Sequence, residues 1–352
     1  MHNFVYNVNA NSLHLQNTYG GISMKLFRIL PILLAAMLLF SACGRNEAEK
    51  VSAPSEEDTI TIVTSFYPMY IFTKNIAKDI EGIKVLNMAE PKTGCLHDYQ
   101  MTPADMKKVE KAEIMVINGA GLESFIEKVI KERPQLKIVE ASKGLEMLEG
   151  EGHHHGSEHD LEDIHEEDTE HKEHEDHEHD HSVNPHIWVS ISGAIDEVKN
   201  IGEQLAVADP SNAQKYRSNT DEYVKRLEDQ REKMYSALKT ISNRNIVTFH
   251  EAFPYFAKEF DLNIIEVIET EEGSTPSAGE LANKIRKIKE SNVKALFTES
   301  QNLTSLVQTV SKEVGIKVYE LDPIVTGPVE PQLDAYEKAM DENLKVLLEA
   351  LK

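Results

Sequence analysis

Three of the 15 histidines in the sequence stand apart from the others. His97, His186 and His250 each lie in a short motif at a junction between a predicted strand and a predicted helix. Neutral imidazole is the commonest metal ligand near pH 7, and three imidazoles with a carboxylate or a water form a tetrahedral zinc site. A single histidine is more often a surface residue or a hydrogen-bonded structural one. The spacing alone does not show that the three side chains converge, so both interpretations stay open.

A second group of histidines occupies an acidic tract, residues 149–181, that has almost no apolar side chains. This tract carries −14 of the net charge of −23. It cannot order itself by burial, so it is either a solvated insertion or a set of weak, exchangeable zinc sites. Its ten histidines are His153, His154, His155, His159, His165, His171, His174, His177, His179 and His181.

The hydrophobic pattern of the sequence predicts two series of alternating strands and helices. These elements must position the histidines. The first series has predicted strands at 59–64, 83–86, 114–117 and 137–139. The second has predicted strands at 245–249, 264–267, 295–298 and 317–321, and a closing helix at 331–351. Alternation of this kind predicts an α/β fold with parallel sheets, in which ligands bind near the carboxyl ends of strands. One long amphipathic helix between the series predicts two lobes with a cleft between them.

The N-terminal region resembles a bacterial lipoprotein signal. Residues 24–43 combine a positive start, the apolar run 29–40 and a cysteine after small residues, so Cys43 is the predicted lipidation site. An uncleaved anchor is the alternative, although the apolar run is short for a span. We predict that residues 1–23 are an upstream extension and that residues 44–58 form a flexible tether. Cys95 is then the one remaining thiol, which predicts no internal disulfide.

These patterns divide the chain into segments. The predicted N-terminal lobe covers 59–148 and resumes over 184–208 after the His/acid-rich loop 149–183. The linking helix covers 209–241, and the C-terminal lobe covers 242–352.

Four motifs make the chain resemble the metal-binding lipoproteins of ABC importers, in particular the zinc-binding branch (the ZnuA/AdcA-like, cluster A-I solute-binding family). They are HDYQMTPADM at 97–106, NPHIWVS at 184–190, TFHEAFPYFAKEFDL at 248–262 and ELDPI at 320–324. The resemblance covers residues 24–351. It implies two Rossmann-like lobes joined by one long rigid helix, with zinc in the interlobe cleft.

The resemblance also implies a ligand set. His97, His186 and His250 match the family's first three ligands, and Asp322 matches the carboxylate of the fourth. A water or Glu299 could take that fourth place, although Glu299 could equally accept a hydrogen bond from a ligand histidine. Histidine rather than glutamate at position 250 favours zinc over manganese. Cys95 could in principle reach the metal, but a small buried residue in the turn is the simpler role.

The implied protein is a monomer that captures zinc and needs no organic cofactor. Its partners would be an ABC permease and its ATPase as separate chains, and the lipid on Cys43 would hold it on the membrane. The histidine tract, placed between the first two ligands as in the family, would be an auxiliary metal-collecting loop. The alternatives within this family are a manganese or broader divalent-metal binding protein and a surface adhesin.

Several other functions are excluded or disfavoured. The acidic net charge argues against nucleic-acid binding. The sequence lacks HExxH, G-x-S-x-G and P-loop motifs, and Glu251 is the one candidate base beside a histidine, so we predict no enzymatic activity. The absence of an 18-residue apolar run in the sequence argues against a permease subunit.

Overall fold

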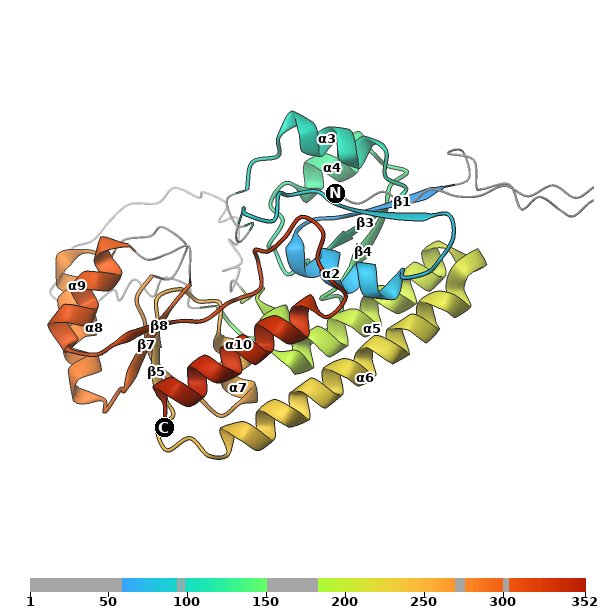
Figure 1. The fold of residues 1–352 in the computed structure, drawn as a ribbon. Helices are drawn as coiled ribbons and strands as arrows, with labels where there is room; N and C mark the ends of the chain where they lie inside the picture. The colour runs from blue at the N-terminus through green and yellow to red at the C-terminus, as the bar shows by residue number, and fades with distance from the viewer. Residues whose placement is uncertain (1–58, 94–95, 97–98, 151–182, 270–275, 300–303) are drawn as a thin grey trace, which may run out of the picture. The chain divides into compact units, whose positions relative to one another are not determined.

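The computed structural model describes residues 59–93, 96, 99–150, 183–269, 276–299 and 304–352. These residues belong to one compact unit that extends from Pro54 to Lys352. Figure 1 shows its elements in chain order.

The first sheet contains four parallel strands in the order β2-β1-β3-β4. They are β1 (Ile60–Thr64), β2 (Ile83–Asn87), β3 (Ile114–Ile117) and β4 (Lys137–Glu140). The helices of this series are α2 (Tyr67–Ile76), α3 (Pro103–Glu110) and α4 (Ile126–Glu132). All four residues of β3 are buried, as expected for a central parallel strand covered on both faces.

The second sheet repeats this arrangement in the order β6-β5-β7-β8, again with parallel pairing. Its strands are β5 (Asn245–Thr248), β6 (Asn263–Val267), β7 (Ala295–Thr298) and β8 (Val318–Glu320). Its helices are α7 (Pro254–Glu259), α8 (Ala278–Glu290) and α9 (Ser305–Val314). The predicted α/β class with two parallel sheets is therefore confirmed, and all eight predicted strands are present.

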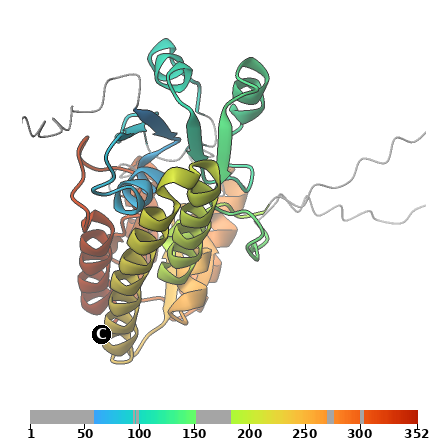
Figure 2. The same cartoon turned by 90° about the vertical axis from the view of Figure 1, so that its right-hand side faces the viewer.

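Long helices connect the two series. A 3-10 turn (Ile187–Val189) leads into α5 (Ile191–Ala208), a second turn (Pro210–Asn212) follows, and α6 (Ala213–Leu238) is the longest helix of the described residues at 26 residues. The final helix is α10 (Ala335–Ala350). Helix α6 lies beside both α5 and α10 (Figures 1 and 2). The predicted long helix is confirmed, whereas α5 was not predicted.

The hydrophobic core is continuous across both series. One large cluster joins side chains of the first sheet, of α5, α6 and α10, and of the second sheet, among them Ile62, Tyr223, Phe297 and Tyr336. A smaller cluster lies between the second sheet and helices α8 and α9. The two sheets therefore share side chains of one hydrophobic core.

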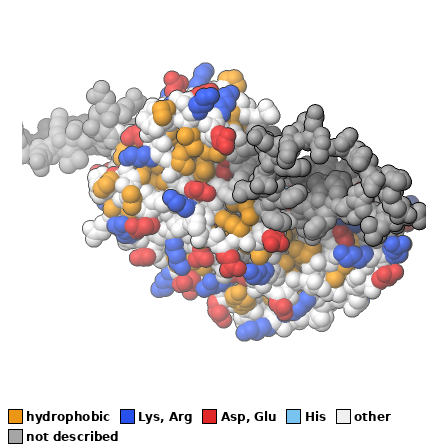
Figure 3. All heavy atoms as spheres, turned by 180° about the vertical axis from the view of Figure 1, so that it is seen from behind, with side chains coloured by type: hydrophobic (Ala, Val, Ile, Leu, Met, Phe, Trp, Pro, Cys, Tyr) orange, Lys and Arg blue, Asp and Glu red, His pale blue; other side chains and the backbone are white. Residues whose placement is uncertain are grey.

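No helix within the described ranges is both long and apolar enough to cross a membrane. On the face shown in Figure 3, basic and acidic side chains are interspersed.

Candidate metal centre

His250 lies just beyond the carboxyl end of β5 and is 4% exposed. Its Nδ1 atom is 2.6 Å from Oε1 of Glu299, which follows β7. Because β5 and β7 are paired, with Thr248 opposite Phe297, the two strand ends bring these side chains together. A carboxylate accepts hydrogen bonds, so Nδ1 carries the hydrogen and the lone pair of the neutral ring is on Nε2. This leaves His250 in the tautomer that binds a metal through Nε2.

His186 lies immediately before the 3-10 turn that leads into α5 and is 2% exposed. Its ring centroid is 5.0 Å from that of His250, with the rings nearly perpendicular. On another side it packs against Trp188, at a centroid distance of 5.3 Å. The structure therefore brings two of the predicted ligands, 64 positions apart in the sequence, into contact distance.

Asp322 follows β8 in a tightly held turn. Its Oδ1 accepts a hydrogen bond of 2.7 Å from the backbone N–H of Ile324, and its own N–H donates to Asn343. The indole N–H of Trp188 donates to the carbonyl of Pro323 at 2.8 Å, which joins this turn to the segment that carries His186. Burial is the main cause that raises the pKa of the Asp322 carboxyl, and the nearby negative charge of Glu299 raises it further. Asp322 thus lies within electrostatic reach of Glu299.

The ligand set is only partly covered by the described residues. His97, Cys95, Cys43 and all ten tract histidines lie outside them. Within the described residues, no three histidine, cysteine or acidic side chains are grouped so that they could hold a metal ion. The structure shows two pairwise contacts, His186 with His250 and His250 with Glu299, and the role of each of these residues and of Asp322 as a ligand stays a prediction.

The two ends of the histidine tract meet close to this centre. Glu149 and Val183 form an antiparallel bridge, and the N–H of Asn184 donates to the carbonyl of Leu148 at 2.8 Å. The chain therefore enters and leaves the tract at one place, and Val183, on the leaving side, is three residues before His186. This arrangement inserts the tract without separating the segments on either side of it.

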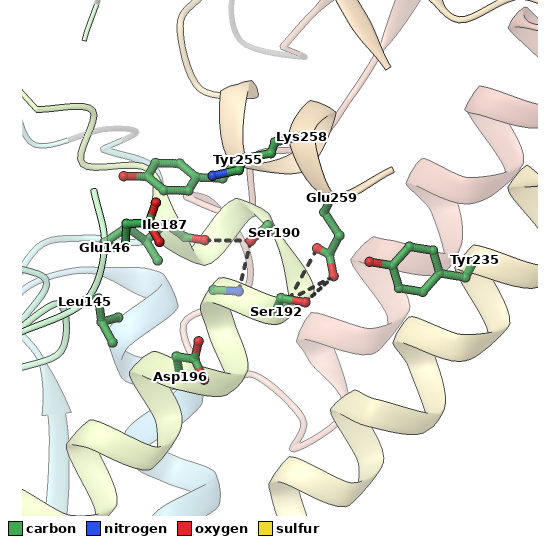
Figure 4. Close-up of a pocket in the computed structure, with 11 residues that line it drawn as sticks. Leu145, Glu146, Ile187, Ser190, Ser192, Asp196, Tyr235, Tyr255, Lys258 and Glu259 are labelled. Atoms are coloured by element: carbon green, nitrogen blue, oxygen red, sulfur yellow. Dashed lines mark hydrogen bonds between the residues drawn. The ribbon is translucent and has the colours of Figure 1, made fainter. Parts of the chain in front are cut away.

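Two surface pockets lie near these segments without including the candidate ligands. One of about 380 Å³ lies at the start of α5 (Figure 4), and one of about 330 Å³ lies beside Glu149 and Glu251. In the first, the Glu259 carboxylate accepts hydrogen bonds from the N–H groups of Ile191 and Ser192, so the N-terminus of α5 is already capped. His186, His250 and Asp322 line neither pocket.

Comparison with solved structures identifies the class of protein that this fold and site define. The structure of the substrate-binding protein FpvC from Pseudomonas aeruginosa in complex with Mn²⁺ is similar at a TM-score of 0.68 and 27% identity, over 83% of this chain and 98% of that one. A crystal structure of ZnuA is similar at a TM-score of 0.67 and 26% identity, over 84% of this chain and 100% of that one. The chain is a substrate-binding protein of the metal-importing class.

The sequence comparisons define the family more narrowly. Residues 62–350 match the family described as zinc-uptake complex component A, periplasmic. The high-affinity zinc uptake system protein ZnuA of Bacillus subtilis is 34% identical over 326 residues, which are 91% of this chain and 96% of that protein. The chain belongs to this family, the extracytoplasmic zinc-binding components of ABC-type uptake systems.

Proposed function

We propose that this protein captures zinc outside the cytoplasmic membrane and delivers it to an ABC permease. The observation that carries the proposal is the contact between His186 and His250, with Glu299 holding the His250 ring in the tautomer that binds a metal through Nε2. Two buried imidazoles from different segments would supply half of the ligands of a tetrahedral zinc site. We propose that His97 and Asp322 complete it.

The ligand types favour zinc over manganese. Imidazole suits zinc, whereas carboxylate, carbonyl and water ligands suit manganese. Three histidines and one carboxylate would therefore select zinc, even though a related substrate-binding protein, FpvC, has been described with Mn²⁺. Manganese binding is the alternative that a direct competition between the two ions would reveal.

The remaining features fit delivery at a membrane surface. We propose that Cys43 carries a lipid, that the histidine tract collects zinc in weak sites, and that the permease and ATPase are separate chains. Because both tract ends lie at the Glu149–Val183 bridge, zinc released from the tract would be close to His186. In cells, Cys43→Ala should move the protein from the membrane fraction to the soluble fraction.

The proposal is tested by titrating the chain from Gly44 onward with zinc and with manganese against a chromophoric chelator. We expect one tight zinc site, several weak zinc sites and weak manganese binding. Removing 152–181, which keeps the Glu149–Val183 bridge, should abolish only the weak sites. His250→Ala should lose the tight site, whereas His153→Ala, a matched change in the tract, should keep it. Loss of the tight site on removal of 152–181, or tight zinc binding by His250→Ala, would contradict the proposed ligand set.

A further inference from the structure

We infer that Asn184 is a positioning residue of the metal centre: its side chain orients the His186 ring and ties it to the strand end that carries His250. This inference rests on the proposed zinc-capture function. Asn184 is 2% exposed and lies between the histidine tract and His186.

The hydrogen bonds of Asn184 fix which side-chain atom is oxygen and which is nitrogen. Its Nδ2 atom is 3.0 Å from the backbone carbonyl of Glu251 and 3.2 Å from Oε1 of the same residue. Both of these atoms accept hydrogen bonds, so the NH₂ group of the Asn184 side chain must point toward them. Its Oδ1 atom accepts the backbone N–H of His186 at 3.0 Å, which requires an oxygen at that position.

The orientation of the amide then decides the tautomer of His186. The Nδ1 atom of His186 is 3.1 Å from the same Oδ1 atom. Because Oδ1 can only accept, Nδ1 must carry the hydrogen, and the lone pair of the neutral ring is on Nε2. His250 reaches the same state through Glu299. Both histidines thus have the lone pair on Nε2, the atom through which each would bind a metal.

Asn184 also connects the two ligand segments directly. Glu251 follows His250 in the chain, so the bonds from Nδ2 hold the His250 segment while Oδ1 holds His186. One buried side chain therefore spans both lobes at the site. A shift of either segment would break one of these bonds and change the separation of the two rings.

The backbone of Asn184 is held as firmly as its side chain. The hydroxyl of Tyr255, in α7, donates to its carbonyl at 2.8 Å and accepts the N–H of Leu148 at 2.9 Å. The N–H of Asn184 donates in turn to the Leu148 carbonyl at 2.8 Å. Residues on both sides of the tract are thus bonded to Tyr255 of α7, and these bonds support the placement of Asn184 beside His186.

The test compares Asn184→Leu, Asn184→Asp and the control Asn75→Leu in the full chain. Asn75 is also 2% exposed and also donates to two carbonyls, those of Ile71 and Leu333, but it contacts no proposed ligand. Zinc affinity at the tight site is measured by chelator competition. In the metal-free protein, the ring nitrogen signals of His186 are followed by ¹H–¹⁵N correlation and assigned by their loss in His186→Gln.

Asn184→Leu should weaken tight zinc binding by about 10- to 100-fold, the usual effect of removing a partner of a ligand histidine. Asn75→Leu should change zinc affinity by less than about threefold, because Asn75 shares no hydrogen-bond partner with the proposed ligands. Asn184→Asp keeps an acceptor for His186. This variant should therefore keep the wild-type ring nitrogen signals of His186, which Asn184→Leu should lose.

Wild-type zinc affinity in Asn184→Leu, or an unchanged His186 ring pattern in that variant, would overturn the inference. So would an Asn184→Asp protein whose ring pattern matches that of Asn184→Leu. A wild-type chain without a tight zinc site would instead reject the proposed function. The ring nitrogen comparison needs no metal, so it separates these two failures.

Discussion

At the scale of single residues, each of the two described candidate histidines has a hydrogen-bond acceptor at its Nδ1 atom. Glu299 is 2% exposed and stands 2.6 Å from Nδ1 of His250. An acceptor in this position fixes the ring orientation and makes the imidazole a stronger ligand. This contact corresponds to the hydrogen-bonding role considered for Glu299 from the sequence, and a buried acceptor so placed has a measurable effect on metal affinity.

We therefore expect Glu299→Leu to weaken zinc binding by about 10- to 100-fold, because His250 loses its partner. Glu299→Gln should weaken zinc binding much less, because the amide oxygen still accepts the Nδ1 hydrogen. Glu320→Gln, at the exposed end of β8, is the matched control and should bind zinc as the wild type does. The measurement is chelator competition. Equal losses in the Gln and Leu variants would mean that the carboxylate itself binds the metal.

At the scale of elements, the close approach of α5 and α6 sets the frame on which His186 is held. Gly202 allows this approach, since a Cβ atom built there would lie 2.1 Å from Oγ1 of Thr220. The Thr220 hydroxyl is itself bonded to the carbonyl of Tyr216, so it cannot easily move away. A glycine here costs helix propensity but allows close helix packing.

Gly202→Ala should lower the free energy of unfolding by about 1–3 kcal/mol, because the added methyl group overpacks the helix contact. Gly279→Ala is the control, since nothing lies within 4 Å of a Cβ built at that helical position in α8. That variant should be more stable by about 0.4–1 kcal/mol, because alanine restricts the unfolded chain. Urea unfolding followed by far-UV circular dichroism measures both. Equal effects of the two substitutions would contradict the packing argument.

At the scale of the whole molecule, buried carboxyl groups make stability depend on pH. Glu123 is fully enclosed, and burial raises its pKa to about 7 despite hydrogen bonds from Asn118 and Ser65. Glu197, on the buried face of α5, has neither oxygen hydrogen-bonded to a described residue. Burial is the main cause that raises the pKa of the Glu197 carboxyl well above its usual value, and the negative charge of Glu123 adds to the effect. An ionised Glu197 would be strongly unfavourable in the folded protein.

The sign of the effect follows from proton linkage. Below the ordinary glutamate pKa of 4.5, Glu197 is protonated in both folded and unfolded chains. Above it, the unfolded chain releases a proton that the folded chain keeps, so the free energy of unfolding falls with rising pH. This loss continues at about 1.4 kcal/mol per pH unit until the folded pKa is reached.

Glu197→Met removes this ionisation while filling a similar volume. We expect the variant to gain stability relative to the wild type between pH 5 and pH 7, by about 1.4 kcal/mol per unit while Glu197 stays protonated in the fold. Asp196→Asn, at the exposed neighbouring position, should show a much smaller change. Urea unfolding at several pH values gives the difference. A variant that is less stable than the wild type by the same amount at every pH would show that Glu197 has a satisfied structural role.

Much of the fold could be predicted from local patterns. Apolar runs such as Ile114–Ile117 predict buried parallel strands because both faces of the sheet are covered. Helix α5 was overlooked although Ile191, Ile195, Val198 and Leu205 have helical spacing and are buried. Its two glycines, Gly193 and Gly202, weaken the local helix signal, and its stability comes from packing against α6.

By itself, the sequence determined the α/β class with parallel sheets, and it predicted the residue types of a zinc site with His250 and Asp322 just beyond strands, because these depend on local composition and periodicity. The pairing of β5 with β7 decided that Glu299, 49 positions away, supports His250. The packing of the Asn184 segment against α7 decided that Asn184 supports His186. Such contacts join segments distant in the chain, and only the packing of whole elements against each other specifies them.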